Sequence, residues 1–284
     1  MKHALLTALR TEPWAMLPEH LDAMRAHVLV WDGKLPEAAK PMDFAVANGV
    51  AVIPIHGVMR QKGDLFTRIF GGASTEIIAA DVLRAASDPA VRQIVLDINS
   101  PGGSVFGVQE LSAAIKAADQ RKPVFAVANS MAASAAYWTA SQARKLYVTT
   151  GGQVGSIGVY QMHADWSKRN EMDGIDITYI SAGKYKTEGN PDAPLTDEAK
   201  ADMQTTVNAY YDAFVSAVAS GRGVTPKAVR DGMGQGRMVM ASDAKSQGMA
   251  DGVRTLADLL TGLWTTNAAR ATAANAVMES EIGY

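Results

Sequence analysis

The chain has 284 residues, 48% of them hydrophobic and 20% charged, which is enough to bury one sizeable core with short additions. Its 27 lysines and arginines nearly balance its 29 aspartates and glutamates, so the charge gives no support for a nucleic-acid or membrane partner. The absence of cysteine excludes disulfides, thiolate metal sites and a cysteine nucleophile. No hydrophobic leader follows Met1, because Arg10, Glu12 and Pro13 interrupt it. We expect a soluble, cytoplasmic protein.

The first forty residues predict a helical arm. Apolar residues recur at helical spacing over residues 4–27, with breaks near Pro13 and Pro18. A stretch rich in proline, lysine and glutamate follows and is typical of a linker. The sequence therefore predicts an N-terminal arm and linker over residues 1–43, followed by one main domain over 44–264.

From residue 50 onward, segments typical of strands alternate with segments typical of helices. Strands are expected at residues 50–58, 93–98, 123–129, 145–149, 156–162 and 176–181, and helices at 75–87, 104–119, 133–143, 196–220, 225–232, 241–247 and 255–263. This alternation favours an α/β domain with a mostly parallel sheet covered by helices. The last residues, 265–284, carry no clear apolar stripe and are expected to form a flexible tail.

Three segments follow predicted strands at the places where parallel sheets carry their functional loops. They are Ser100-Pro101-Gly102-Gly103, the segment from Ser130 to Ser134, and the segment from Gly183 to Lys186. The carboxyl ends of parallel strands meet at one edge of the sheet. We therefore expect the three segments to form a single site.

Ser134 is the strongest candidate for a nucleophile. Small residues flank it in Ala132-Ala133-Ser134-Ala135-Ala136, and a helix is predicted to begin at this point. Backbone N–H groups at a helix start can stabilise an oxyanion, although serine is equally common there as a plain helix cap. No histidine lies close in sequence to the three segments, so the general base is expected to be a lysine.

Two lysines of the third segment, Lys184 and Lys186, can fill that role, and composition does not separate them. A lysine acts as a base only where burial disfavours its charged form, and a solvated loop lysine is the ordinary alternative. Ser156, in the glycine-punctuated strand Gly155 to Val159, can hold the lysine in place or can mark a plain β-bulge. No histidines have metal-ligand spacing and no dinucleotide fingerprint is present, so we expect no metal and no cofactor.

Together these segments resemble the signal peptide peptidase A (protease IV) family of Ser-Lys peptidases, and more closely its phage head-maturation branch. The matching stretches, spread over residues 48–255, are Ile98 to Gly103, Met131 to Trp138, Gly155 to Val159, and Lys186 with Asn190-Pro191 and Leu195-Thr196. The opening segment with Trp14 and Pro18 is similar to the N-terminal arm of the phage members. The resemblance implies the ClpP/crotonase-like fold, with mostly parallel sheets flanked by helices, assembled into a homo-oligomer.

The resemblance also implies roles for individual residues. The implied site consists of Ser134 as nucleophile, Lys186 as general base, Ser156 as the residue that orients the lysine, and the backbone N–H groups of Gly102, Gly103 and Ala135 as the oxyanion hole. Lys186 takes the family's place, in preference to Lys184, because it precedes Asn190-Pro191 at the family's interval. The family often has Gly-Gly after the nucleophile, where this chain has Ala135-Ala136.

The activity that the resemblance implies is that of a serine endopeptidase with a Ser-Lys dyad. The phage branch implies scaffold, capsid or portal proteins as substrates, cut inside a procapsid in the host cytoplasm. Three alternatives stay open: a soluble peptidase of the bacterial signal-peptide-peptidase type, a crotonase-type acyl-CoA enzyme, and a non-catalytic capsid assembly protein. No membrane or nucleic-acid partner is expected.

Overall fold

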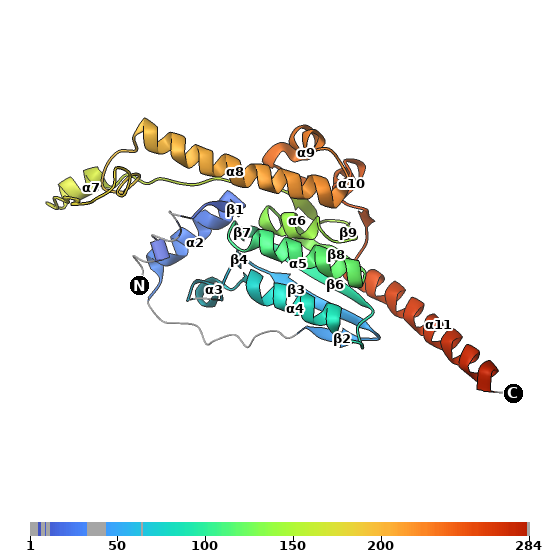
Figure 1. The fold of residues 1–284 in the computed structure, drawn as a ribbon. Coiled ribbons are helices and arrows are strands. Elements are labelled where there is room, and N and C mark those ends of the chain that lie inside the picture. Colours follow the sequence, from blue (N-terminus) through green and yellow to red (C-terminus); the bar gives the residue numbers. More distant parts are fainter. Residues whose placement is uncertain (1–4, 7–8, 10–11, 33–43, 64, 283–284) are drawn as a thin grey trace.

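A computed structural model describes residues 5–6, 9, 12–32, 44–63 and 65–282 of the chain (Figure 1). The strands are β1 (Trp14–Met16), β2 (Ala45–Ala47), β3 (Val50–His56), β4 (Met59–Arg60), β5 (Ala73–Ser74), β6 (Gln93–Ser100), β7 (Gly102–Ser104), β8 (Val124–Ala133), β9 (Lys145–Val148), β10 (Gln153–Gly155), β11 (Met238–Met240) and β12 (Gly252–Val253). The helices are α2 (Pro18–Val30), α3 (Leu65–Phe70), α4 (Thr75–Ser87), α5 (Val108–Arg121), α6 (Ala135–Ala140), α7 (Ser167–Met172), α8 (Asp197–Arg222), α9 (Pro226–Gly232), α10 (Ala241–Ser246) and α11 (Leu256–Ile282).

The larger sheet is mostly parallel and is covered on both faces. Its strands run in the order β11-β10-β8-β6-β3-β2, with β9 beside the first half of β8 and β12 beside β9. Only β2–β3 and β10–β11 pair antiparallel. In β6, Ile94 and Leu96 enter the core beneath α4 and α5, while Val95 enters a second core with Leu259 of α11. Burial on both faces explains why this strand is a continuous apolar run, and the predicted α/β class is confirmed.

A smaller sheet lies at the carboxyl end of β6 and carries the N-terminal arm. Its order is β1-β7-β4-β5, and β7 follows β6 after the single residue Pro101. The predicted helical arm therefore includes a short strand, β1, ahead of α2. Residues 33–43 of the predicted linker lie outside the described residues.

Helix α8 connects the body to a projecting segment. It begins at Thr196, whose hydroxyl accepts a hydrogen bond from Ala199 N–H at 3.1 Å, and it ends at Gly223 in the left-handed conformation. Phe214, in its second half, stacks on Trp138 of α6 with ring centroids 4.7 Å apart. The first half extends beyond the body together with α7 and the loop between α7 and α8 (Figure 1).

Three predicted elements differ from the structure. Residues 156–162, predicted as a strand, have no regular structure apart from a single bridge at Tyr160. The strand here is β10, which ends at Gly155 because the neighbouring strand β8 ends level with it at Ala133. Residues 176–181, predicted as a strand, have no regular structure and are exposed, because an extended segment forms a strand only against a partner. Residues 265–282, predicted as a flexible tail, continue α11, since the segment is rich in alanine and has no glycine or proline. Asn267 is buried and exchanges hydrogen bonds with the side chain of Gln93, so the body extends past the predicted boundary at residue 264.

Candidate active site

Ser134 occupies a strained junction between β8 and α6. Its backbone has φ 53° and ψ −116°, a conformation that a residue with a side chain rarely adopts and that costs roughly 1–3 kcal/mol. Its N–H donates to Gly155 carbonyl at 2.7 Å, and its own carbonyl accepts from Trp138 N–H at 2.8 Å. The surrounding hydrogen bonds thus hold the strained residue in place, as is common for groups that carry chemistry.

The segment around Ser156 lies directly beside Ser134. Strand β10 pairs parallel with the end of β8, so that Gly155 is level with Ala133. Ser156 then also takes a positive φ of 53° and is buried, and the Ser134 hydroxyl faces the carbonyl oxygen of Gly158 at 3.4 Å. The structure therefore brings two of the predicted side chains, Ser134 and Ser156, to adjacent strand ends.

The Pro-Gly-Gly turn completes this side of the site. A methyl group on Gly102, which has φ 94°, would lie 3.0 Å from the Ser134 β-carbon, so only glycine fits here. The N–H of Gly102 donates to the Ser100 hydroxyl at 3.2 Å, and that hydroxyl donates to Gly57 carbonyl at 2.6 Å. Gly103 lies so close to β4 that a methyl group would be 1.9 Å from the Met59 carbonyl oxygen.

Lys186 is not brought to Ser134 within one copy of the chain. It is exposed and follows Tyr185, whose hydroxyl donates to Glu198 in the first turn of α8 at 2.9 Å. The sixteen residues from Glu198 to Phe214, which packs beside α6, span about 24 Å of helix. Lys184 pairs with Glu198 at 3.0 Å, so both lysines belong to the projecting segment and not to the body.

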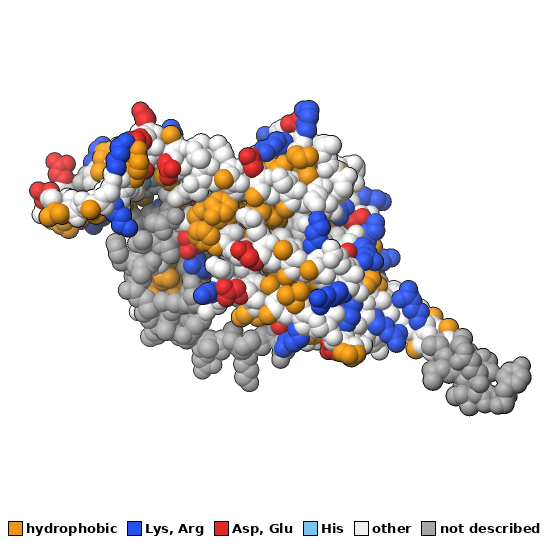
Figure 2. All heavy atoms as spheres, viewed as in Figure 1, with side chains coloured by type: hydrophobic (Ala, Val, Ile, Leu, Met, Phe, Trp, Pro, Cys, Tyr) orange, Lys and Arg blue, Asp and Glu red, His pale blue; other side chains and the backbone are white. Residues whose placement is uncertain are grey.

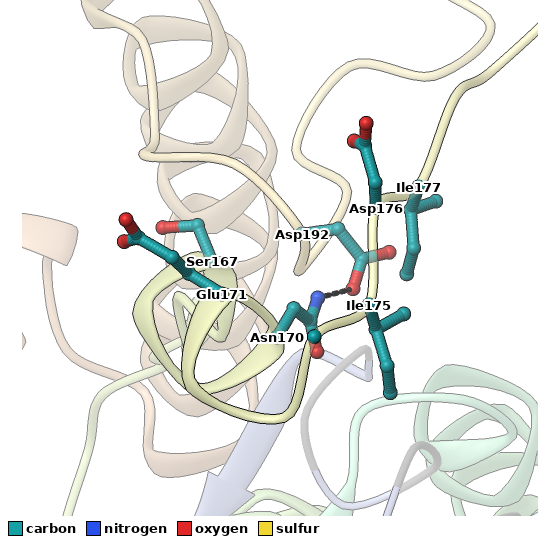
Figure 3. Close-up of a pocket in the computed structure, with 8 residues that line it drawn as sticks. Ser167, Asn170, Glu171, Ile175, Asp176, Ile177 and Asp192 are labelled. Carbon is teal, nitrogen blue, oxygen red and sulfur yellow. Dashed lines mark hydrogen bonds between the residues drawn. The ribbon is translucent and has the colours of Figure 1, made fainter.

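A polar pocket of about 420 Å³ at α7 shows how this segment is organised (Figure 3). Asp192 accepts a hydrogen bond from the Asn170 amide at 2.8 Å and another from the Tyr179 hydroxyl. Its carboxylate therefore ties the loop after Lys186 to α7. None of the residues predicted for the site lines this pocket.

Sequence reasoning missed a polar cluster in the second halves of β3, β6 and β8. The His56 ring lies 3.1 Å from Asp97, and Asn129 donates to the other oxygen of the same carboxylate at 3.0 Å. His56 ends the apolar strand β3 but is exposed at 43% of its side-chain area. The detectable signal was Asp97, a single carboxylate inside the apolar run of β6.

The fold and the site together define a class. Mostly parallel sheets flanked by helices, with a strained serine beside a glycine turn at the strand exits, are the architecture of an α/β protein of the ClpP-like type. Among the residues that the structure describes, no helix is both long and apolar enough to cross a membrane.

Comparison with known proteins gives the family. A model of peptidase family S49 matches residues 116–269. The capsid assembly protease C of Escherichia phage lambda is 31% identical over 240 residues, which cover 84% of this chain and 54% of that protein. The head-tail preconnector protein GP5 of Enterobacteria phage P21 is 34% identical over 186 residues, which cover 66% of this chain and 37% of that protein. Protease 4 of Haemophilus influenzae is 27% identical over 229 residues, which cover 80% of this chain and 36% of that protein.

The chain belongs to peptidase family S49. The resemblance that the motifs predicted is thereby confirmed. The chain spans about half the length, or less, of these relatives.

Proposed function

We propose that this chain is a serine endopeptidase in which Ser134 attacks the substrate and Lys186 of a second copy acts as the general base. The observation that carries the proposal is the strained, hydrogen-bonded position of Ser134 beside Gly102 and Ser156. Membership of a peptidase family supports the same reading.

A second copy is needed because of where Lys186 lies. Lys186 follows Tyr185, which donates to Glu198, and Glu198 lies about 24 Å of helix before Phe214, the residue that packs on α6. A lysine serves as a general base where water is excluded from its amine. Docking of the segment against another copy would exclude water from the amine and bring it to a serine, which one copy does not do.

The surface of the projecting segment supports such docking. Seven of its large hydrophobic side chains are exposed: Trp166, Met172, Ile175, Ile177, Tyr179, Ile180 and Tyr185. Ile180 is 98% exposed, and Figure 2 shows hydrophobic side chains on the tip of this segment. Exposed apolar groups at this density mark an interaction surface. Residues 176–181, which have no regular structure in one copy, are also suited to pair with a partner's strand.

The proposed mechanism assigns each group one step. The neutral amine of Lys186 takes the proton of the Ser134 hydroxyl while the Ser134 oxygen bonds to the carbonyl carbon of the peptide. Backbone N–H groups of Gly103 and Ala135 stabilise the oxyanion, with Gly102 setting the turn. The ammonium group so formed then protonates the leaving nitrogen as the peptide bond breaks. The regenerated neutral amine takes a proton from the water that attacks the acyl-enzyme, and returns it to the Ser134 oxygen as the acyl bond breaks. Ser156 orients the lysine.

The proposed substrates are scaffold, capsid or portal proteins of a phage, cut in a procapsid in the host cytoplasm. The support is the capsid assembly protease C of phage lambda, whose similarity covers 84% of this chain. The test is mass spectrometry of neighbouring capsid and scaffold proteins after co-expression.

The matched variants are Ser134→Ala, Lys186→Ala and Lys184→Ala. We expect the first two to lower the cleavage rate by at least about a thousandfold, since each removes a reacting group, and Lys184→Ala to leave the rate within about threefold, since Lys184 pairs at the surface. Cleavage that survives Ser134→Ala or Lys186→Ala would refute the dyad.

A further inference from the structure

The strand β1 of the N-terminal arm lies in the groove beside Ser134. On one side it pairs antiparallel with β7, so that Ala15 is level with Gly103. On the other side Trp14 and Tyr160 exchange two backbone hydrogen bonds, of 2.8 and 3.0 Å. The segment is therefore an extended peptide held from both sides, which is how peptides bind when they add a strand to a sheet.

The register of β1 and β7 places the carbonyl group of Ala15 opposite the backbone N–H of Gly103. Val105 N–H donates to Pro13 carbonyl at 3.3 Å, and Leu17 N–H donates to Pro101 carbonyl at 3.0 Å. Hydrogen-bonded pairs alternate along an antiparallel ladder, so Ala15 and Gly103 form the hydrogen-bonded pair between these two. The N–H group that the proposed mechanism assigns to the oxyanion thus faces a carbonyl of the chain itself.

The same carbonyl lies against the nucleophile. A methyl group on Gly102 would be 2.2 Å from the Ala15 carbonyl oxygen and 3.0 Å from the Ser134 β-carbon. The Ala15 oxygen and the Ser134 β-carbon therefore both lie close to the same position beside Gly102. Ser134 is only 1% exposed, which leaves an external peptide no access to its hydroxyl. The Ala15 side chain packs into the main core, whereas Trp14 and Met16 pack into the core of the arm.

The arm is built as a unit that can leave. Its apolar residues form a cluster of their own, which meets the body at Val58, Ile69, Phe70, Tyr160 and Met162. A bidentate ion pair between Glu12 and Arg60, at 2.9 and 3.2 Å, fastens it just ahead of β1. The docked arm also buries the Tyr160 hydroxyl without a hydrogen-bond partner among the described residues, an unfavourable contact that its departure relieves.

We propose that the groove between β7 and Tyr160 is the peptide-binding site, that residues 13–17 occupy it as a pseudosubstrate, and that the position of Ala15 accepts only a small side chain. This inference rests on the proposed function, since it takes Ser134 as the reacting group. It predicts that external peptides bind only to the fraction of molecules whose arm has left, which lowers their apparent affinity by that fraction.

The test measures binding, so that it does not depend on catalysis. Full-length protein carrying Ser134→Ala is titrated into a fluorescent peptide of residues 11–19, Thr-Glu-Pro-Trp-Ala-Met-Leu-Pro-Glu, and anisotropy gives the Kd. Glu12→Arg is added to break the ion pair, and Glu110→Arg, an exposed site on α5 away from the arm, is the control of equal charge change. We expect Glu12→Arg to bind the peptide about tenfold more tightly than the control does.

A second peptide, with lysine in place of Ala15, tests the subsite, and we expect at least about tenfold weaker binding. Trp14→Ala, which removes the largest side chain of the arm cluster, is a second release variant. Equal Kd values in the control and in both release variants, with circular dichroism unchanged, would overturn the pseudosubstrate assignment, as would equal binding of the two peptides. Loss of the proposed function is a separate result, namely no Ser134-dependent cleavage by the unmodified chain.

Discussion

A dyad shared between two copies makes a quantitative prediction for mixed assemblies. Under the proposed mechanism Ser134→Ala and Lys186→Ala should each be inactive, but a heteromer of the two would contain sites in which Ser134 of one copy meets Lys186 of the other. The physical basis is the separation within one copy: Tyr185 is fastened to Glu198 at the far end of α8, about 24 Å of helix from Phe214.

The magnitude follows from counting intact pairs. With equal amounts of the two variants mixed at random in a closed ring, a site needs an intact serine from one copy and an intact lysine from its neighbour. Each condition holds for half of the copies, so about a quarter of the sites are complete in a symmetric assembly. The mixture is therefore expected to regain about a quarter of the unmodified activity, whereas a dyad within one copy would regain none.

The assay is co-expression of the two variants with distinguishable affinity tags and measurement of substrate cleavage by the unselected mixture, because selection for both tags removes homomers and raises the complete fraction above a quarter. Sequential purification then isolates the heteromer. Native mass spectrometry confirms that the purified species contains both. The control mixture pairs Lys186→Ala with the double variant Ser134→Ala, Lys186→Ala, which leaves no intact lysine in any copy. Failure of a verified heteromer to cleave would refute the reasoning about Lys186.

Two further predictions concern the body. Partial burial alone would raise the pKa of Asp251, but hydrogen bonds from Leu146 N–H and Arg222 hold it below its ordinary value, so its contribution to stability is present at neutral pH and is lost as the pH falls through that lowered pKa. Thermal melts should show Asp251→Asn less stable by about 2 kcal/mol at pH 7 and without this acid step; an unchanged slope below pH 4 would contradict it. Phe214→Ala removes a buried ring from its stack on Trp138 and should lower the free energy of unfolding by about 4 kcal/mol in urea titrations; a loss under 1 kcal/mol would show that α8 is not anchored there.

Local sequence patterns were enough to predict the helices and strands that pack into the main core. Helix α4 has the predicted bounds, 75–87, because its apolar residues recur on one face and Ser74 caps it. The apolar run of β6 predicted a strand buried on both faces, and cores on either side explain it. The junction at Ser134 was also found, since the change from strand to helix pattern is local.

The remaining errors share a cause, which is that the deciding contact is distant in sequence. Strand β1 exists because residues near 103 and 160 pair with it. The sequence from Pro13 to Pro18 gives no indication of those partners. Residues 176–181 alternate as a strand would, but one copy offers no edge for them. The separation between Lys186 and Ser134 depends on the path of α8, which a motif in a linear sequence does not contain.

The buried Ser134 and the segment that carries Lys186 are connected through Tyr160. Its backbone holds β1 with two hydrogen bonds, its ring packs against the arm, and burial raises the pKa of its hydroxyl to about 12, with the charges of Asp22 and Glu19 adding to the effect. Directly after Tyr160 the chain leaves toward α7 and the segment that carries Lys186. A change in the path of that segment on assembly therefore acts on the same residue that holds the pseudosubstrate. Movement of the segment that carries Lys186 and departure of β1 from the groove are therefore coupled, since both change the backbone at Tyr160.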